Sequence, residues 1–179
     1  MVNSKKKILI ETSVWVSYFG DRNIENNCRI KTAREVISFC LKEEHELLYC
    51  HYVLRELQNY EGSKRKKDIE ELKNIAKELP SNIGAEPCNK IEVPWDKIGS
   101  VWNNNEENKQ EKRIEASLPD KNNKSNKNDR KILLTAHQQG VNILLHENPK
   151  DFKKIKLDNI QIINLLEVKT VDEFRNLIK

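Results

Sequence analysis

The chain has 179 residues, of which 37% are hydrophobic, and this length favours one compact domain over residues 1–179 rather than two. Lys and Arg outnumber Asp and Glu by 32 to 28, a mildly basic balance that fits a polyanionic partner without requiring one. The four cysteines form no CxxC pair, so we expect reduced thiols in a cytoplasmic protein. No apolar run is long enough to cross a bilayer, so we expect no membrane segment.

The first half of the chain alternates short apolar runs with stretches of helical periodicity. "KILIE" predicts a buried strand over residues 7–11, and apolar residues at helical spacing predict a helix over residues 30–41. "ELLYC" predicts a second strand over residues 46–50. Two helices are expected to follow, over residues 52–61 and about 64–79.

The second half begins with polar sequence and then returns to alternating elements. We interpret residues 80–94 as a loop and expect a helix to begin at Val93. Residues 103–127 are rich in Asn, Lys and Glu, and we interpret them as an insertion that holds a helix and a loop. We then predict a helix over residues 128–140, a strand over 141–146 and a helical turn over 148–155. A last strand is predicted over residues 160–165 and a closing helix over 170–179. This alternation predicts an α/β domain with a mainly parallel central sheet.

Glu11 is an unusual residue for the end of a strand, because it directly follows three aliphatic residues. Strand ends buried in parallel sheets rarely carry an unpaired acid, since it is costly to remove a charge from water. In open α/β sheets, ligands bind beside the carboxyl ends of the strands. Glu11 is therefore a candidate functional carboxylate.

Two further acids occupy positions that should face the core. Glu56 falls on the apolar stripe of the helix predicted over residues 52–61, and Asp129 on the stripe of the helix predicted over residues 128–140. Taken singly, each has another explanation. Glu56 could pair with a lysine at the edge of its stripe, and Asp129 could stabilise the positive end of its helix, with Asn128 as the N-cap.

The three acids together make a stronger case than any one of them. Glu11 is expected at the carboxyl edge of the sheet, where the helices that carry Glu56 and Asp129 would begin or pass. Three carboxylates at one place repel one another, and a divalent cation with oxygen ligands relieves that repulsion. The pattern predicts a site for Mg²⁺ or Mn²⁺, with Glu11, Glu56 and Asp129 as metal ligands and catalytic residues.

Four motifs, in order along nearly the whole chain, make it resemble a PIN domain, the fold of the VapC-type toxin ribonucleases. The family opens with a strand ending in Asp-Thr-Ser and an apolar residue, matched here by "ILIETSVW". Its second and third acids are matched by Glu56 in "HYVLRELQNY" and Asp129 in "NDRKILLTAHQQG". Its buried strand leading into an Asp-Phe element is matched by "ILLHENPKDF".

The resemblance implies a three-layer α/β/α fold and a metal-dependent endoribonuclease that hydrolyses phosphodiester bonds. In that family the acids bind Mg²⁺ or Mn²⁺, which activate water for RNA cleavage. The chain is then expected to be the toxin of a toxin–antitoxin pair or a related RNA-cleaving defence protein. The expected partners are an RNA substrate, a cognate antitoxin protein and a second copy of the chain in a homodimer.

The chain departs from the family pattern at two positions. Glu11 stands where the family has Asp, and its extra methylene moves the carboxylate by roughly 1.5 Å, which predicts reduced activity. Asn148 stands at the fourth acidic position, as a neutral metal ligand or as the cap of a helical turn. Glu147 or Asp151 is an alternative fourth ligand, and the sequence does not choose between them. Both departures motivate a second reading, a degenerate PIN domain that binds RNA or a protein without cutting.

Residues around the acids supply the remaining predicted contacts. Ser13, two residues past the strand end, is expected to orient Glu11 or a metal-bound water. Basic residues that flank the third and fourth acidic positions are predicted to contact RNA phosphates, although lysine-rich stretches are more commonly just solvated surface. These residues are Lys121, Lys124, Lys127, Arg130, Lys150 and Lys153.

Overall fold

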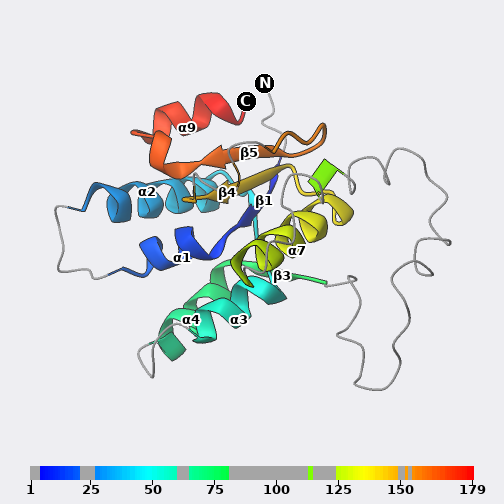
Figure 1. Cartoon of the computed structure of the whole chain (residues 1–179). Coiled ribbons are helices and arrows are strands. Elements are labelled where there is room, and N and C mark those ends of the chain that lie inside the picture. The colour runs from blue at the N-terminus through cyan, green and yellow to red at the C-terminus, as the bar shows by residue number, and fades with distance from the viewer. Residues whose placement is uncertain are drawn as a thin grey trace, which may run out of the picture.

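The centre of the computed structural model is a five-stranded sheet in which all strands run parallel, in the order β3-β2-β1-β4-β5. Helices lie on both sides of the sheet, an α/β arrangement consistent with the expected three layers (Figure 1). The predictions of an α/β domain and a parallel sheet are confirmed. The structure describes residues 5–20, 27–59, 65–80, 113–114, 124–148, 152 and 155–179.

Strands and helices alternate along most of the chain, as the sequence predicts. The strands are β1 (Lys7–Ile10), β2 (Glu46–Cys50), β3 (Lys77–Leu79), β4 (Ile143–His146) and β5 (Gln161–Asn164). The helices are α1 (Thr12–Tyr18), α2 (Cys28–Lys42), α3 (His51–Asn59), α4 (Arg65–Ile75), α7 (Lys124–Gln138) and α9 (Val171–Leu177), with the 3₁₀ turn η1 (Leu165–Glu167).

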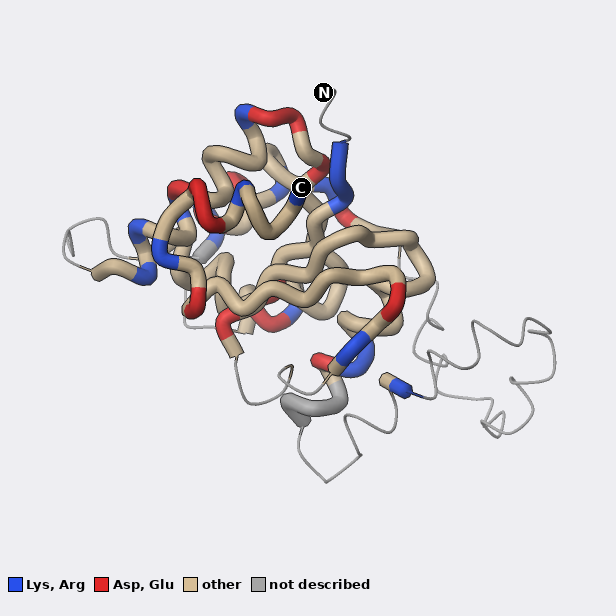
Figure 2. The backbone as a smooth tube through the Cα atoms, turned by 90° about the horizontal axis from the view of Figure 1, so that it is seen from above, with Lys and Arg blue, Asp and Glu red and all other residues tan. Residues whose placement is uncertain are grey.

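The core lies between the sheet and its two helical layers. Helices α2 and α9 pack together on one side, where the rings of Phe39 and Phe174 meet edge to face, and α3 contacts both α4 and α7 on the other. The aliphatic residues of β1 and β4 are fully buried, as expected for central strands covered on both faces. Strands β4 and β5 carry no Lys, Arg, Asp or Glu, and the charged residues lie mainly outside them (Figure 2).

Local sequence signals fix several helix ends. Gly140 follows α7 with a φ of 62°, a left-handed conformation that glycine adopts without strain. The N–H of Gly140 donates to the carbonyl of His137, and that of Val141 to the carbonyl of Ala136, which completes a Schellman motif. At the start of α9, the Thr170 hydroxyl accepts the N–H of Glu173 at 3.2 Å. The predicted end of one helix at Gly140 and start of another at Thr170 are both confirmed.

Helix α1 was not predicted. Its sequence, TSVWVSY, is rich in β-branched and aromatic residues, which lowers its intrinsic helix propensity. Two tertiary features favour the helix nevertheless. The Glu11 side chain caps its first turn, and Val14 and Trp15 are fully buried in the core. Burial therefore outweighs local propensity in this segment.

The helix predicted over residues 64–79 is wrong at its end. Helix α4 stops at Ile75, and residues 77–79 form β3, the edge strand paired with β2. The sequence KEL has one buried residue, Leu79, so it shows no apolar run that would reveal a strand. Charged residues on an edge strand also oppose pairing with other chains.

Helix α7 begins at Lys124, four residues before the predicted start at residue 128. Asn128 is therefore not the N-cap, and Asp129 lies in the second turn rather than the first, so the explanation of Asp129 as a helix-end charge is wrong. The helix expected to open at Val93 lies outside the described residues, as does most of the insertion and of the turn predicted over 148–155. Within the described ranges, no helix is long and apolar enough to cross a membrane.

Candidate functional site

Strands β1 and β4 are neighbours at the point where the order of the sheet reverses direction, from β1 towards β3 on one side and from β4 towards β5 on the other. Ligands of open α/β sheets bind at such a switch point, beside the carboxyl ends of the strands. Glu11 directly follows β1 and Glu147 directly follows β4. The backbone N–H of Glu11 donates to the carbonyl of Leu145 at 3.0 Å and holds the two strand ends together.

Glu11 caps α1. Its backbone is extended, and its carboxylate accepts the backbone N–H of Ser13 at 2.9 Å. The Ser13 hydroxyl also donates to the same carboxylate oxygen, Oε2. The predicted contact between Ser13 and Glu11 is therefore present. The residue is only 6% exposed, so two donors from the first turn of α1 stabilise a carboxylate that has little access to water.

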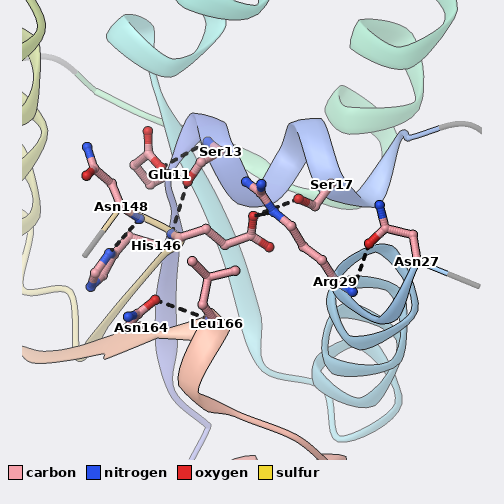
Figure 3. Close-up of polar contacts among 10 residues, drawn as sticks. Glu11, Ser13, Ser17, Asn27, Arg29, His146, Asn148, Asn164 and Leu166 are labelled. Carbon is pink, nitrogen blue, oxygen red and sulfur yellow. Dashed lines mark hydrogen bonds and ion pairs between the residues drawn. The ribbon is translucent and has the colours of Figure 1, made fainter. Parts of the chain in front are cut away.

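Ser13 also connects the two strand ends. Its hydroxyl oxygen accepts the backbone N–H of Glu147 at 3.0 Å while the hydroxyl donates to Glu11 (Figure 3). One serine thus fixes the acid after β1 against the backbone after β4. This use of both hydroxyl functions makes Ser13 a positioning residue at the centre of the site.

Glu56 lies on α3 beside the start of α1. One of its carboxylate oxygens accepts the hydroxyl of Thr12, and the other accepts the side-chain amide of Asn128 at 2.7 Å. The residue is half-buried, and both of these partners are neutral rather than the lysine that the alternative explanation invoked. The Glu56 carboxylate thereby joins three helices, α1, α3 and α7, at the carboxyl edge of the sheet.

Asp129 is buried on α7, with 5% of its surface exposed. Its neighbours on the predicted apolar stripe, Ile132, Leu133 and Ala136, are fully buried, so the inward orientation of this helix face is confirmed. Asp129 directly follows Asn128, the residue whose amide contacts Glu56. Glu56 on α3 and Asp129 on α7 therefore lie on two helices that are joined by the hydrogen bond from Asn128, the residue before Asp129, to Glu56.

Burial raises the pKa of Glu11 above its usual value. The hydrogen bonds from Ser13 oppose this shift, whereas the negative charge of Glu56 adds to it. The Glu56 effect means that the two carboxylates are close enough to repel each other. Because burial and the neighbouring charge of Glu56 both disfavour the ionised form of Glu11, a proton or a cation near its carboxylate would be stabilising.

A second buried acid, Glu147, lies beside this group. Its side chain is 1% exposed and accepts the Ser17 hydroxyl at 2.7 Å, and it forms an ion pair with Nε of Arg29 (Figure 3). Burial raises the pKa of Glu147, while Ser17 and Arg29 act in the opposite direction. The sequence named Glu147 as a fourth acid but missed Ser17 and Arg29. Ser13 and Ser17 are four residues apart, a spacing that indicates a shared face only once α1 is known to be helical.

Asn148 and His146 form a small group after β4. The backbone N–H of Asn148 donates to Nδ1 of His146 at 3.1 Å, and the His146 ring lies 4.6 Å from that of Phe152. His146 is 3% exposed, and burial lowers its pKa to about 4. The ring is thus neutral near pH 7 and acts as an acceptor that shapes this turn. Asp151, the other alternative fourth ligand, lies outside the described residues.

Among the residues that the structure describes, no three His, Cys, Asp or Glu side chains are grouped as a metal site. The hydrogen bond from Thr12 places Glu56 beside the residue that follows Glu11, and the convergence of Asp129 with both acids stays a prediction. The chemistry of the donors fits a hard cation, because they are carboxylate and amide oxygens held at a buried edge of the sheet. A metal ion would have to compete with Ser13 for Glu11 and with Thr12 and Asn128 for Glu56.

The structure tests few of the predicted RNA contacts. Arg130 is half-buried on α7, and Lys124 and Lys127 lie in the first turn of the same helix. Lys121, Lys150 and Lys153 lie outside the described residues. Phosphate binding by all of them stays a prediction.

The comparisons with known proteins leave the family open. A scan against protein-family models found no match, and a search of curated proteins found no significant relative. The fold and the site by themselves define a class, that of α/β proteins with a parallel five-stranded sheet and buried carboxylates at its switch point.

Proposed function

We propose that this chain is a divalent-metal-dependent endoribonuclease of the PIN type, either the toxin of a toxin–antitoxin pair or a related RNA-cleaving defence protein. The observation that carries the proposal is the placement of Glu56 beside the end of β1, at the switch point of a parallel sheet: Thr12, the residue after Glu11, donates its hydroxyl to the Glu56 carboxylate. Acids of like charge held close together are costly without a cation, and ligand sites of this architecture lie at this edge. The acidic motifs in their order along the chain support the same function.

Glu11, Glu56 and Asp129 are the residues that would hold Mg²⁺ or Mn²⁺. The bound cation would lower the pKa of water and neutralise charge on the phosphoryl group. Ser13 would keep the Glu11 carboxylate oriented, since it already donates to it. Thr12 and Asn128 would do the same for Glu56. Neutral donors are suited to this task, because they orient a carboxylate without cancelling its charge.

A second candidate function is a PIN-like module that binds RNA or a protein without cutting. The observation that favours it is the hydrogen bonding of the acids. Both oxygens of Glu56 already have donors, and Glu11 accepts two hydrogen bonds from Ser13. Carboxylates that are satisfied by protein donors can be stable without a metal. Calorimetric titration with Mg²⁺ or Mn²⁺ separates the candidates, since only the enzyme requires the cation.

The test of the enzyme proposal is RNA cleavage by the purified protein with Mg²⁺, with Mn²⁺ and with EDTA. We expect cleavage only with a divalent metal, and a loss of roughly 100-fold or more in the Asp129→Asn variant, because the amide removes one anionic ligand. The variant should keep its fold, which circular dichroism and thermal melting would check.

Cleavage in EDTA, or full activity of the Asp129→Asn protein, would contradict the proposal. A matched control is Asp158→Asn, which makes the same chemical change at an exposed residue that pairs with Arg113. This control should cleave at the rate of the wild-type protein. A gene for a small DNA-binding protein beside this one would favour the toxin over the other defence functions.

A further inference from the structure

A charged group of three residues, Arg29, Ser17 and Glu147, lies next to the acidic site but is not part of it. Glu147 extends from the end of β4 and Ser17 from the last turn of α1, and both are buried. Arg29 reaches them from the first turn of α2 (Figure 3). Segments far apart in the sequence thus meet at one point, because the contact between Arg29 and Glu147 spans 118 positions.

The distance of this group from the acidic site follows from helix geometry. Ser13 contacts Glu11, and Ser17 contacts Glu147, and the two serines lie four residues apart on α1. Residues with this spacing lie on the same helix face about one turn apart, roughly 5–6 Å. Ser13 also accepts the backbone N–H of Glu147, so the two groups share one continuous hydrogen-bond network. The hydrogen bond between Ser17 and Glu147 therefore lies about one helical turn from that between Ser13 and Glu11.

The two partners of the ion pair differ in exposure. The side chain of Glu147 is 1% exposed, whereas that of Arg29 is 45% exposed. Arg29 contacts Glu147 through Nε, and its terminal nitrogens make no hydrogen bond within the described residues. The buried carboxylate thus holds Nε of a guanidinium group whose side chain keeps 45% of its surface exposed. Such planar donors match the geometry of phosphate oxygens.

From this arrangement we propose that Arg29 is a phosphate-binding residue, positioned by Glu147 and Ser17, that contacts a backbone phosphate of RNA next to the one at the acidic site. The inference rests on the proposed function for the identity of its ligand. A guanidinium beside the acids would add to the effect of a bound metal ion, because both oppose the repulsion between the acids and a polyanion. Glu147 then serves to orient Arg29 through its Oε2 atom, which also accepts the Ser17 hydroxyl.

A purely structural ion pair is the alternative. Buried pairs often contribute little net stability, because desolvation of the charges offsets their attraction. The half-exposed Arg29, at the ligand-binding edge of the sheet, fits phosphate contact better.

The experiment measures binding of a fluorescein-labelled, mixed-sequence single-stranded RNA by anisotropy in EDTA, where no metal-dependent cleavage occurs. The double variant Arg29→Gln/Glu147→Gln removes both charges, keeps the net charge and leaves no buried carboxylate unpaired. We expect its affinity to fall roughly tenfold and the slope of log affinity against log salt to decrease by about 0.7, as for one lost phosphate contact to a single strand.

Two further variants sharpen the test. Lys31→Gln removes one positive charge from the same helix at an exposed side chain paired with Glu35, and it should keep the wild-type slope. Arg29→Lys keeps the charge and should recover most of the slope but not the full affinity, because lysine lacks the planar donors.

A double variant that keeps the wild-type salt slope and binds RNA within twofold of the wild-type affinity would overturn the proposal, as would a wild-type protein that does not bind the RNA. Failure of this inference is distinguishable from failure of the proposed function. Metal-dependent cleavage with no effect of Arg29 on binding would remove only the inference. Binding that depends on Arg29, in a protein that never cleaves, would keep the inference and favour the non-catalytic module.

Discussion

The two edges of the central sheet carry the same kinds of charged residues in opposite environments. At the amino edge, Lys5 pairs with Glu44 and Lys77 with Glu46, around a hollow of about 450 Å³. The two lysines and Glu44 are at least 70% exposed. At the carboxyl edge, Glu11 and Glu147 are almost completely buried.

Burial rather than charge content separates the two edges. Exposed ion pairs are screened by water and salt, so those of the amino edge contribute little to stability or specificity. Acids buried at the carboxyl edge have raised pKa values and depend on a few protein donors. The hollow lies at the edge with the weaker electrostatic interactions, and it does not mark the candidate site.

Of the substitutions at the two edges, we expect that of Glu11 to have the largest effect on RNA cleavage. We expect Glu11→Gln to reduce metal-dependent cleavage by roughly 100-fold or more, because the neutral amide is a poor ligand for Mg²⁺. Glu11→Asp should keep or raise the activity, since Asp is the residue at this position in the PIN family that the sequence resembles and is itself a favourable N-cap. Cleavage rates and melting temperatures of both variants provide the measurement.

The melting temperatures separate a metal ligand from a purely structural residue. Gln at position 11 can still accept the N–H of Ser13, so a loss of activity with a retained melting temperature indicates metal binding. If Glu11 were only structural, the Asp variant would mainly lose stability. Wild-type cleavage and metal affinity in Glu11→Gln would show that Glu11 is not a ligand, and the site assignment would then be withdrawn.

Two buried histidines allow the edges to be compared by pH. His146, at the carboxyl edge, has a pKa lowered to about 4, and His45, at the amino edge, has a pKa lowered mainly by burial. A lowered folded-state pKa means that the unfolded chain binds the proton more readily. Stability is then complete above the unfolded pKa, near 6.5, and is lost as pH falls towards the folded pKa.

For His146 we expect this loss to be on the order of 3 kcal/mol between pH 6.5 and 4. His146→Gln should remove that part of the pH dependence, as measured by urea unfolding at several pH values. His45→Gln should remove a smaller part, because His45 is closer to solvent, with 8% exposed against 3%. Equal pH dependence in the wild-type and His146→Gln proteins would contradict a buried neutral imidazole.

A smaller effect is expected from the basic residues around α7. If Lys124, Lys127 and Arg130 contact phosphates, replacing two of them with Gln should weaken RNA binding for all sequences. The slope of log affinity against log salt should decrease by about 0.7–0.9 for each lost contact. An unchanged slope, measured by anisotropy in EDTA, would mean that these residues are only solvated.

The smallest effect is expected at the amino edge. Lys5→Gln removes the exposed pair with Glu44, and we expect its melting temperature to stay within about 2 °C of the wild-type value. RNA cleavage should also be unchanged. A large loss of either property would show that the amino edge has a function that the comparison of the two edges does not assign to it.

Several elements of the fold were predictable because their signals are local. The aliphatic runs of β1, β2 and β4 indicate buried strands, and Gly140 and Thr170 mark helix ends through backbone conformation and capping. The alternation of these elements is enough to predict a parallel α/β sheet. Glu11 was also predictable as an acid of interest, because its position after three aliphatic residues is visible in the sequence itself.

Other features depend on contacts between distant parts of the chain. Helix α1 forms against its β propensity because Val14 and Trp15 are buried, and β3 exists because its backbone pairs with β2. Sequence periodicity placed Glu56 on an inward face, but its contact with Asn128 spans 72 positions and required the packing of α3 against α7.

The same distinction applies to the charged groups of the site. The sequence by itself determined which acids stand at strand ends and on apolar helix faces, since residue type and local periodicity fix those positions. Only the tertiary structure decided that Ser13 joins Glu11 to the end of β4, and that Arg29 and Ser17 contact Glu147. The physical reason is that hydrogen bonds and ion pairs require distances of a few ångströms, which are set by packing between elements and not by spacing along the chain.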